Sequence, residues 1–270
     1  YKLAFGLRWE NWDSKYNDSN QESFNPSDNM NGGKISLIKN NDNSNIYFSI
    51  ARGYKQGGFN LGLDATDNSI KDSLIYDPEF LTNYEIGLSS NSNNSILNYS
   101  AVFFFSKRED QQVLISRQVD PTDPNTFSYL TQNAAEGENY GLEISSNYFV
   151  RDNLNLYANF GLLKTKIKNW ESRSDLENRA QAHAPERNFS LGANLSFMNN
   201  FYLKMDINGK SSFFYSDSHN NKSKSYKLVN LSLGYTKSNF STDIWVRNLF
   251  DEYYSTRGFF FGNEAPNFVD

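Results

Sequence analysis

Residues 187–197 have the sequence RNFSLGANLSF, in which every second side chain from Phe189 to Phe197 is apolar. The same alternation returns in residues 201–208 (FYLKMDIN) and 229–236 (VNLSLGYT). Successive side chains of a β-strand point to opposite faces, so each run predicts a strand with one apolar and one polar face. The chain is therefore predicted to be an all-β protein.

Applied along the whole chain, this alternation predicts eleven strands whose connections are alternately short and long. The strands are expected near residues 1–12, 32–40, 45–55, 79–90, 96–118, 126–149, 154–168, 187–198, 201–214, 226–236 and 240–248. The short connections are rich in Asn, which favours turns, and the long ones cover residues 13–31, 56–78, 119–125, 169–186, 215–225 and the chain after 249. Outer-membrane barrels have short periplasmic turns and longer extracellular loops, so we expect an antiparallel transmembrane β-barrel with its long loops outside the cell.

The composition narrows the class of protein. Of the 270 residues 38% are hydrophobic, and no run approaches the roughly 18 apolar residues of a membrane helix, which excludes a helical membrane protein. The 22 Phe, 17 Tyr and 4 Trp suit the aromatic girdles of a membrane barrel, although a soluble β protein or surface adhesin with an aromatic core is an alternative. The absence of Cys excludes disulfides and thiolate metal sites, and the net charge of −5 excludes a basic surface for nucleic acid.

Five motifs follow one another along the chain at the ends of the predicted strands. They are ARGYKQGGFN at 51–60, PEFLTNYEIG at 78–87, NYGLE at 139–143, APER at 184–187 and VRNLFDEYY at 246–254. In sequence and order these motifs resemble recurrent barrel segments of TonB-dependent outer-membrane receptors. The matching positions in the first and last motif are Tyr54, Lys55, Gly57, Gly58, Phe59, Asn60, Asn248, Leu249, Phe250, Asp251 and Tyr254.

The resemblance implies an up-and-down barrel of about 22 strands in the outer membrane of a Gram-negative bacterium. Counted back from the family's last strand, this chain supplies about the eleventh to the twenty-first. Residues 1–270 are then one partial barrel domain without the family's plug domain and final strand, and the sheet is expected to be open because it is truncated.

The resemblance also implies a function, which is energised uptake of a scarce nutrient. The expected partners are outer-membrane lipid, the receptor's own plug domain, the TonB–ExbB–ExbD complex acting through the missing N-terminal part, and a small-molecule chelate. A ferric siderophore or related iron complex is the expected ligand class, and a plug-free passive porin is the alternative function. We predict no catalytic residue, cofactor or metal site, because the sequence shows no nucleophile–base pairing and no metal-ligand spacing.

Two inward carboxylates are the first candidate site. Alternation places Glu85 and Glu143 on the polar face, and it turns Tyr84, Ile86, Leu142 and Ile144 toward lipid. The family resemblance implies that the two glutamates contact arginines of the plug, whereas solvated lumen carboxylates are the alternative.

The long loops are the second candidate site, because binding residues concentrate on loops that a rigid scaffold holds. Aromatic and cationic residues there could stack on a chelate, with loop or interface packing as the alternative. The candidates are Trp170, Arg173, Phe213, Phe214, Tyr215, Phe259 and Phe260. The two histidines, His183 and His219, lie in separate long loops and are expected to be solvated rather than metal ligands.

Overall fold

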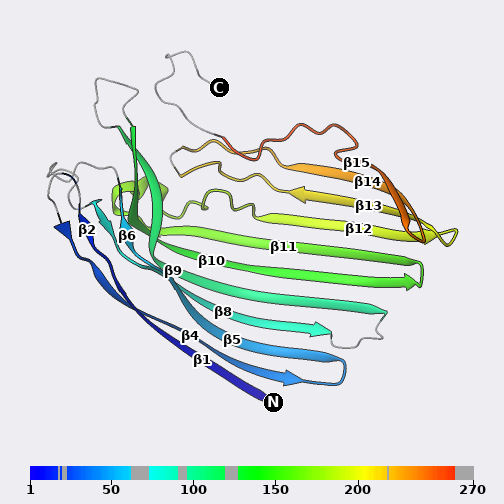
Figure 1. Ribbon diagram of the computed structural model, residues 1–270, viewed down its shortest axis with the longest axis horizontal. Coiled ribbons are helices and arrows are strands. Elements are labelled where there is room, and N and C mark those ends of the chain that lie inside the picture. Colours follow the sequence, from blue (N-terminus) through cyan, green and yellow to red (C-terminus); the bar gives the residue numbers. More distant parts are fainter. Residues whose placement is uncertain are drawn as a thin grey trace, which may run out of the picture.

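Eleven strands of the computed structural model form one antiparallel sheet, in which each strand pairs with its neighbours along the chain (Figure 1). The structure describes residues 1–17, 19, 23–61, 73–90, 96–118, 127–217 and 219–258. The strands of the sheet are β1 (Lys2–Asp13), β4 (Ser27–Asn40), β5 (Ser44–Lys55), β8 (Glu79–Ser90), β9 (Leu97–Gln118), β10 (Phe127–Arg151), β11 (Leu154–Asn169), β12 (Arg187–Phe197), β13 (Phe201–Lys210), β14 (Tyr226–Lys237) and β15 (Phe240–Val246). The predicted antiparallel, up-and-down fold is therefore confirmed.

The sheet is curved but not closed (Figure 1). Within the described residues, β1 and β15 are its two edges and do not pair with each other. Two short hairpins lie in the connections, β2 (Tyr16–Asn17) with β3 (Ser23–Phe24) and β6 (Gly58–Phe59) with β7 (Ile75–Tyr76). No helix in the described part of the chain has the length and apolar character needed to cross a membrane.

Two predicted strand limits need correction. The strand expected from residue 32 begins at Ser27, because β4 stays paired with β1 as far as the Asp13–Ser27 pair. Polar residues such as Asp28 and Asn29 hide this extension from a periodicity argument. The strand expected to end at residue 214 ends at Lys210, where its pairing with Tyr226 on β14 stops.

Many large apolar side chains on one face of the sheet are exposed. A lateral row of directly paired residues joins Leu3, Leu37, Phe48, Ile86 and Phe103 across five strands, and all of them are exposed. Tyr84 and Ile144 are exposed on the same face, as alternation predicted for lipid-facing positions. In water such a face would favour aggregation, whereas in a bilayer it matches the hydrocarbon core.

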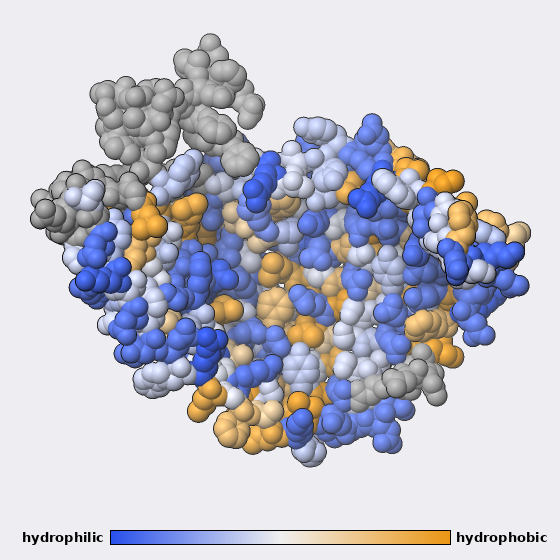
Figure 2. Space-filling view, in the orientation of Figure 1, coloured by the Kyte–Doolittle hydropathy of each residue, from blue (hydrophilic) through white to orange (hydrophobic). Residues whose placement is uncertain are grey.

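The opposite face is polar and carries tyrosine rings that lie flat across glycines of the next strand. A Cβ atom at Gly234 would overlap the ring of Tyr202, whose hydroxyl donates a hydrogen bond to Asp243 one strand further on. Tyr47 covers Gly87 in the same way. Hydrophilic residues also make up much of the face seen in Figure 2, with apolar residues between them.

Candidate functional site

The long connections gather at one end of the sheet, which we call the outer end. Figure 1 shows β2, β6 and the short 3-10 helix η2 (Glu171–Leu176) there, and tight turns joining β4 to β5 and β12 to β13 at the opposite end. Long loops are extracellular in outer-membrane barrels. In such a barrel the outer end would face the outside of the cell.

Asn60 fastens the loop that follows β5 to strand β10. Its side-chain Nδ2 donates to the Thr131 carbonyl at 2.7 Å, and its Oδ1 accepts the Thr131 N–H at 2.6 Å. The same Nδ2 donates to the Ser73 carbonyl at 2.6 Å. The Asn60 amide thus pairs with β10 as the backbone of another strand would, and the residue is only 8% exposed.

A second asparagine makes a similar clamp two residues further along β10. Asn133 Nδ2 donates to the Asp77 carbonyl at 2.8 Å, and its Oδ1 accepts the Asp77 N–H at 2.6 Å. Gln112 on β9 donates to the carbonyls of Gln56 and Asp77 at 2.8 and 3.0 Å. Both described ends of the loop from residue 56 to 78 are therefore tied to the β9–β10 hairpin, which Figure 1 shows rising from the sheet.

The loop after β11 has a small hydrophobic core of its own. Trp170, Ile167 and Leu176 are buried together, and Val113 of β9 packs against them. Trp170 is 3% exposed, so its ring takes part in loop packing, which the sequence left open as the alternative to ligand binding. Three apolar side chains near one another at a strand end favour burial over presentation to solvent.

Residues 178–181 run beside the outer part of β11. The Asn178 N–H donates to the Ile167 carbonyl at 2.8 Å, and the Ile167 N–H donates to the Arg179 carbonyl at 3.0 Å. The Gln181 N–H donates to Thr165 Oγ1 at 2.9 Å. This pairing fixes the backbone that carries Arg179.

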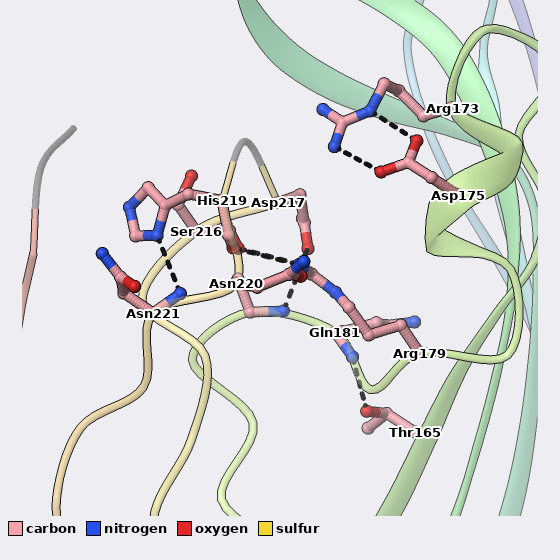
Figure 3. Close-up of polar contacts among 11 residues, drawn as sticks. Thr165, Arg173, Asp175, Arg179, Gln181, Ser216, Asp217, His219, Asn220 and Asn221 are labelled. Atoms are coloured by element: carbon pink, nitrogen blue, oxygen red, sulfur yellow. Dashed lines mark hydrogen bonds and ion pairs between the residues drawn. The ribbon is translucent and has the colours of Figure 1, made fainter. Parts of the chain in front are cut away.

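Arg179 joins this loop to the loop between β13 and β14 (Figure 3). Its Nη1 donates to the His219 carbonyl at 3.0 Å and to Asn220 Oδ1 at 2.8 Å. Its Nη2 donates to the Ser216 carbonyl and to Asp217 Oδ1, both at 2.8 Å. The side chain is 10% exposed, so one guanidinium supplies four charged hydrogen bonds in a largely dehydrated position.

The aromatic run from Phe213 to Tyr215 packs within the same loop pair. Phe213 is 7% exposed and its ring centre lies 5.9 Å from that of His183, so it is packed within the loop. Arg179 lies 4.3 Å from the centre of the Phe214 ring, and Tyr215 meets Phe213 edge-on. The other two aromatic candidates, Phe259 and Phe260, lie outside the described residues.

Arg173 pairs locally rather than across loops. Its Nε and Nη2 donate to the two carboxylate oxygens of Asp175 at 2.9 and 3.0 Å. These hydrogen bonds lower the pKa of Asp175 below its ordinary value of 3.8, so the pair stays ionised at neutral pH. Among the described residues, no three His, Asp or Glu side chains gather in a way that could hold a metal ion.

Glu85 and Glu143 lie on the polar face of the wall, close to one tyrosine. The Tyr47 hydroxyl donates to Glu85 Oε2 at 3.2 Å, and Asn83 Nδ2 donates to Glu85 Oε1 at 2.7 Å. Lateral pairing puts Tyr47, Gly87, Val102 and Glu143 in one row, so both glutamates share a face as predicted. Within the described part of the chain, neither carboxylate has an ion-pair partner.

Several positions of the motifs at residues 51–60 and 246–254 fix the local backbone. Asn248 has a φ of 52° and accepts the Glu252 N–H on its Oδ1 at 2.9 Å, and its Nδ2 donates to the Glu252 carbonyl at 3.0 Å. Tyr254 packs against Tyr226 at 4.7 Å between ring centres. Gly57 lies so close to the Tyr76 carbonyl that a Cβ atom would not fit.

The remaining motif positions are less uniform. Lys55 and Phe250 are exposed, and Gly58 lies against the Tyr76 ring. The Tyr54 hydroxyl donates to Glu10 at 2.8 Å, and Phe59 packs against Tyr16. Leu249 donates its N–H to the Val229 carbonyl, and Asp251 has a φ of 50°. Most positions of these two motifs therefore join the end of a strand to the loop that follows it.

Comparison with known proteins confirms the family resemblance. The family described as "TonB dependent receptor-like, beta-barrel" matches residues 1–249. A probable TonB-dependent siderophore receptor, PiuA of Acinetobacter baumannii, is 27% identical over 178 residues, covering 63% of this chain and 22% of PiuA. This chain thus spans about a fifth of that relative's length.

Two solved structures have the same fold at low sequence identity. The ferric yersiniabactin uptake receptor FyuA from Yersinia pestis is 17% identical with a TM-score of 0.69, over 96% of this chain and 38% of FyuA. The copper transporter OprC is 15% identical with a TM-score of 0.70, over 94% of this chain and 40% of OprC. The chain therefore belongs to the TonB-dependent receptor family, whose non-enzymatic barrels lie in the outer membrane of Gram-negative bacteria, and it corresponds to part of such a barrel.

Proposed function

We propose that this chain is part of the wall and outer loops of a receptor for TonB-coupled uptake of a ferric siderophore or related iron complex. The names of PiuA and FyuA support the ligand class, although OprC carries a different metal on the same fold. The observation that supports the energised mechanism is the pair of inward carboxylates, Glu85 and Glu143. Two such carboxylates are expected in a barrel whose lumen holds a protein domain with basic partners for them.

Among the described residues, the wall strands next to these carboxylates do not neutralise them. The inward positions paired with them on neighbouring strands are Ser49 and Phe104 for Glu85, and Val102 and Gly161 for Glu143. None of these is basic. A carboxylate enclosed by protein without a cation is costly, so an enclosed lumen requires basic groups from its occupant. Arginines of the receptor's own plug domain would supply them, which gives Glu85 and Glu143 the role of holding the plug.

This role is tested by Glu85→Gln and Glu143→Gln in the full-length receptor. Gln keeps the shape and can still accept a hydrogen bond, so the fold is preserved while the charge is lost. We expect the double variant to admit large antibiotics that the unaltered receptor excludes. Glu10→Gln is the matched control, because Glu10 already pairs with Arg8. Unchanged antibiotic sensitivity and plug stability in the double variant would refute the role.

The uptake itself is tested by growth of a deletion strain on single defined iron sources. The receptor gene should restore growth on at least one ferric siderophore, and only in cells that have TonB. Growth restored without TonB would instead support a passive porin. Failure on every iron chelate, with TonB-dependent uptake of another nutrient, would overturn the ligand class and leave the energised mechanism standing.

A further inference from the structure

The outward face of the sheet has a chemical boundary that follows its lateral rows. One row of directly paired residues is Phe5, Ile35, Ile50, Tyr84, Phe105 and Tyr140, and its next member is Lys164 on β11. The adjacent row runs from Leu3 to Leu162 and then reaches Arg187 on β12. A third row runs from Ile46 through Phe160 and Phe189 to Lys227 on β14.

Each of these cations marks the outer limit of the apolar face on its own strand. Lys164 lies two residues beyond Leu162, and Arg187 and Lys227 each lie two residues before the first apolar residue of a strand that runs back from the outer end. Arg52 follows Ile50 and Lys107 follows Phe105 in the same position on β5 and β9. We call these five residues the cation collar. Strands of a barrel are tilted, so a level membrane boundary crosses successive lateral rows.

The protein neutralises the collar only in part, and Glu138, the acidic neighbour on β10 that pairs laterally with Lys107, forms its ion pair with Lys168 at 3.1 Å. Lys107 pairs with Glu109 at 2.8 Å, and Arg52 lies 4.5 Å from the centre of the Phe80 ring. Lys164, Arg187 and Lys227 are exposed, and no carboxylate of the described residues forms an ion pair with them. Three unpaired cations therefore face outward at the edge of the hydrocarbon zone.

The opposite boundary of the apolar face differs. It carries Lys39 on β4, Lys237 on β14 and the exposed Arg151 of β10, which pairs with Leu154, while β5, β8 and β9 have the uncharged Ser44, Ser90 and Leu97 at their outward positions there. The basic residues are thus concentrated on the side of the long loops. This asymmetry indicates an anionic partner in the outer leaflet rather than a general preference for both interfaces.

We propose that Lys164, Arg187 and Lys227 bind the phosphate groups of a phosphorylated glycolipid in the outer leaflet. Basic side chains at a membrane boundary attract anionic headgroups, and ammonium and guanidinium groups both hydrogen-bond to phosphate oxygens. The acyl chains of that lipid lie along the exposed Leu162 and Phe160 directly below the cations. Because all three cations are on the outside of the wall, this site is separate from the path of the transported nutrient.

The test uses the full-length receptor purified in detergent, with binding of bis-phosphorylated lipid A measured by native mass spectrometry. We expect Lys164→Gln, Arg187→Gln and Lys227→Gln combined to weaken binding by roughly a hundredfold, at about fivefold for each cation. The matched control is Lys39→Gln with Lys237→Gln, which removes charge at the other boundary and should leave binding unchanged. Heat-dependent mobility in gels verifies that each variant is folded.

Two further measurements define the ligand. Dephosphorylated lipid A should bind the unaltered receptor as weakly as intact lipid A binds the triple variant, and inorganic phosphate should not compete at millimolar concentration. Lys164→Arg with Lys227→Arg should retain binding. Equal binding of the dephosphorylated lipid, or an unchanged affinity in the folded triple variant, would overturn the proposal.

Discussion

Replacing Arg179 by alanine is expected to release the loop between β13 and β14 from the loop after β11. The guanidinium makes four hydrogen bonds to residues 216–220, and its plane lies over Phe214. Removing it also leaves the partly buried Asp217, whose side chain is 25% exposed, without its cation. Across the two loops, the Asp217 carboxylate then keeps the weaker hydrogen bond that the Ala182 N–H donates to its Oδ1 at 3.3 Å.

The loss of free energy that holds the loop closed can be estimated from the burial of the Arg179 side chain. A hydrogen bond to a charged group contributes about 1.5–3 kcal/mol, but the freed carbonyls and Asp217 regain water when the loop opens. Breaking a buried pair by removing one partner costs about 3–5 kcal/mol, and we take about 3 kcal/mol because the loop is near the surface. That value raises the population of the open loop by roughly 150-fold. The strands of the wall do not depend on this contact, so global stability should change little.

Hydrogen exchange on the full-length receptor measures this opening directly. The amides of Tyr215 and Ser223, which donate to the Asn221 and Phe213 carbonyls, should exchange roughly 150-fold faster in Arg179→Ala. Arg173→Ala is the control, because the hydrogen bonds of the Arg173 side chain among the described residues go to Asp175 two residues away, and it should leave these amides unchanged. Arg179→Lys should restore only part of the protection, since an ammonium cannot present the same planar set of donors. Equal exchange in the alanine variants of Arg179 and Arg173 would show that the loops are held together by something else.

Other predictions concern the loop clamp and the wall. Asn60→Ala removes both hydrogen bonds to the Thr131 backbone and should lower the free energy of opening of the attached loop by about 2–3 kcal/mol. The loop should then be cleaved faster by proteases between residues 56 and 78, and an unchanged rate of cleavage would exclude the clamp. Gly234→Ala should destabilise the folded barrel by about 1–3 kcal/mol, because the new methyl group displaces the Tyr202 ring. Gly6→Ala, which meets no atom within 4 Å, should leave the urea midpoint unchanged. A similar shift in both glycine variants would mean that backbone flexibility, not the ring, sets the cost.

The wall was predictable because its chemistry repeats with the period of a strand. Each strand in contact with lipid must alternate, and the hydrogen-bonded neighbours of a barrel follow chain order, so the sequence carries both strand identity and pairing. The errors occur where this constraint ends. At Asp28 and Asn29 the strand β4 extends beyond the lipid, and polar residues on both faces remove the signal.

The outer loops were not predictable in the same way. Trp170 and Phe213 are aromatic residues in polar segments, and only their neighbours in space decide whether such rings are buried or exposed. Arg179 and Asn60 are held by backbone groups of segments distant in sequence, 216–220 and Thr131, which no local pattern identifies. The motif match did single out Asn60, but without a physical reason for its position.

That reason lies in the unequal lengths of the strands. β10 pairs with β11 only from Glu136 onward, so its outer residues have a partner in β9 on one side and an open edge on the other. An open edge leaves backbone N–H and carbonyl groups unpaired. Asn60 satisfies this edge at Thr131, and residues 178–181 do the same for β11 beyond Leu162, where its pairing with β12 stops. The loops therefore dock where strand pairing ends, and a wall with staggered strand ends determines which loops are held together above the lumen.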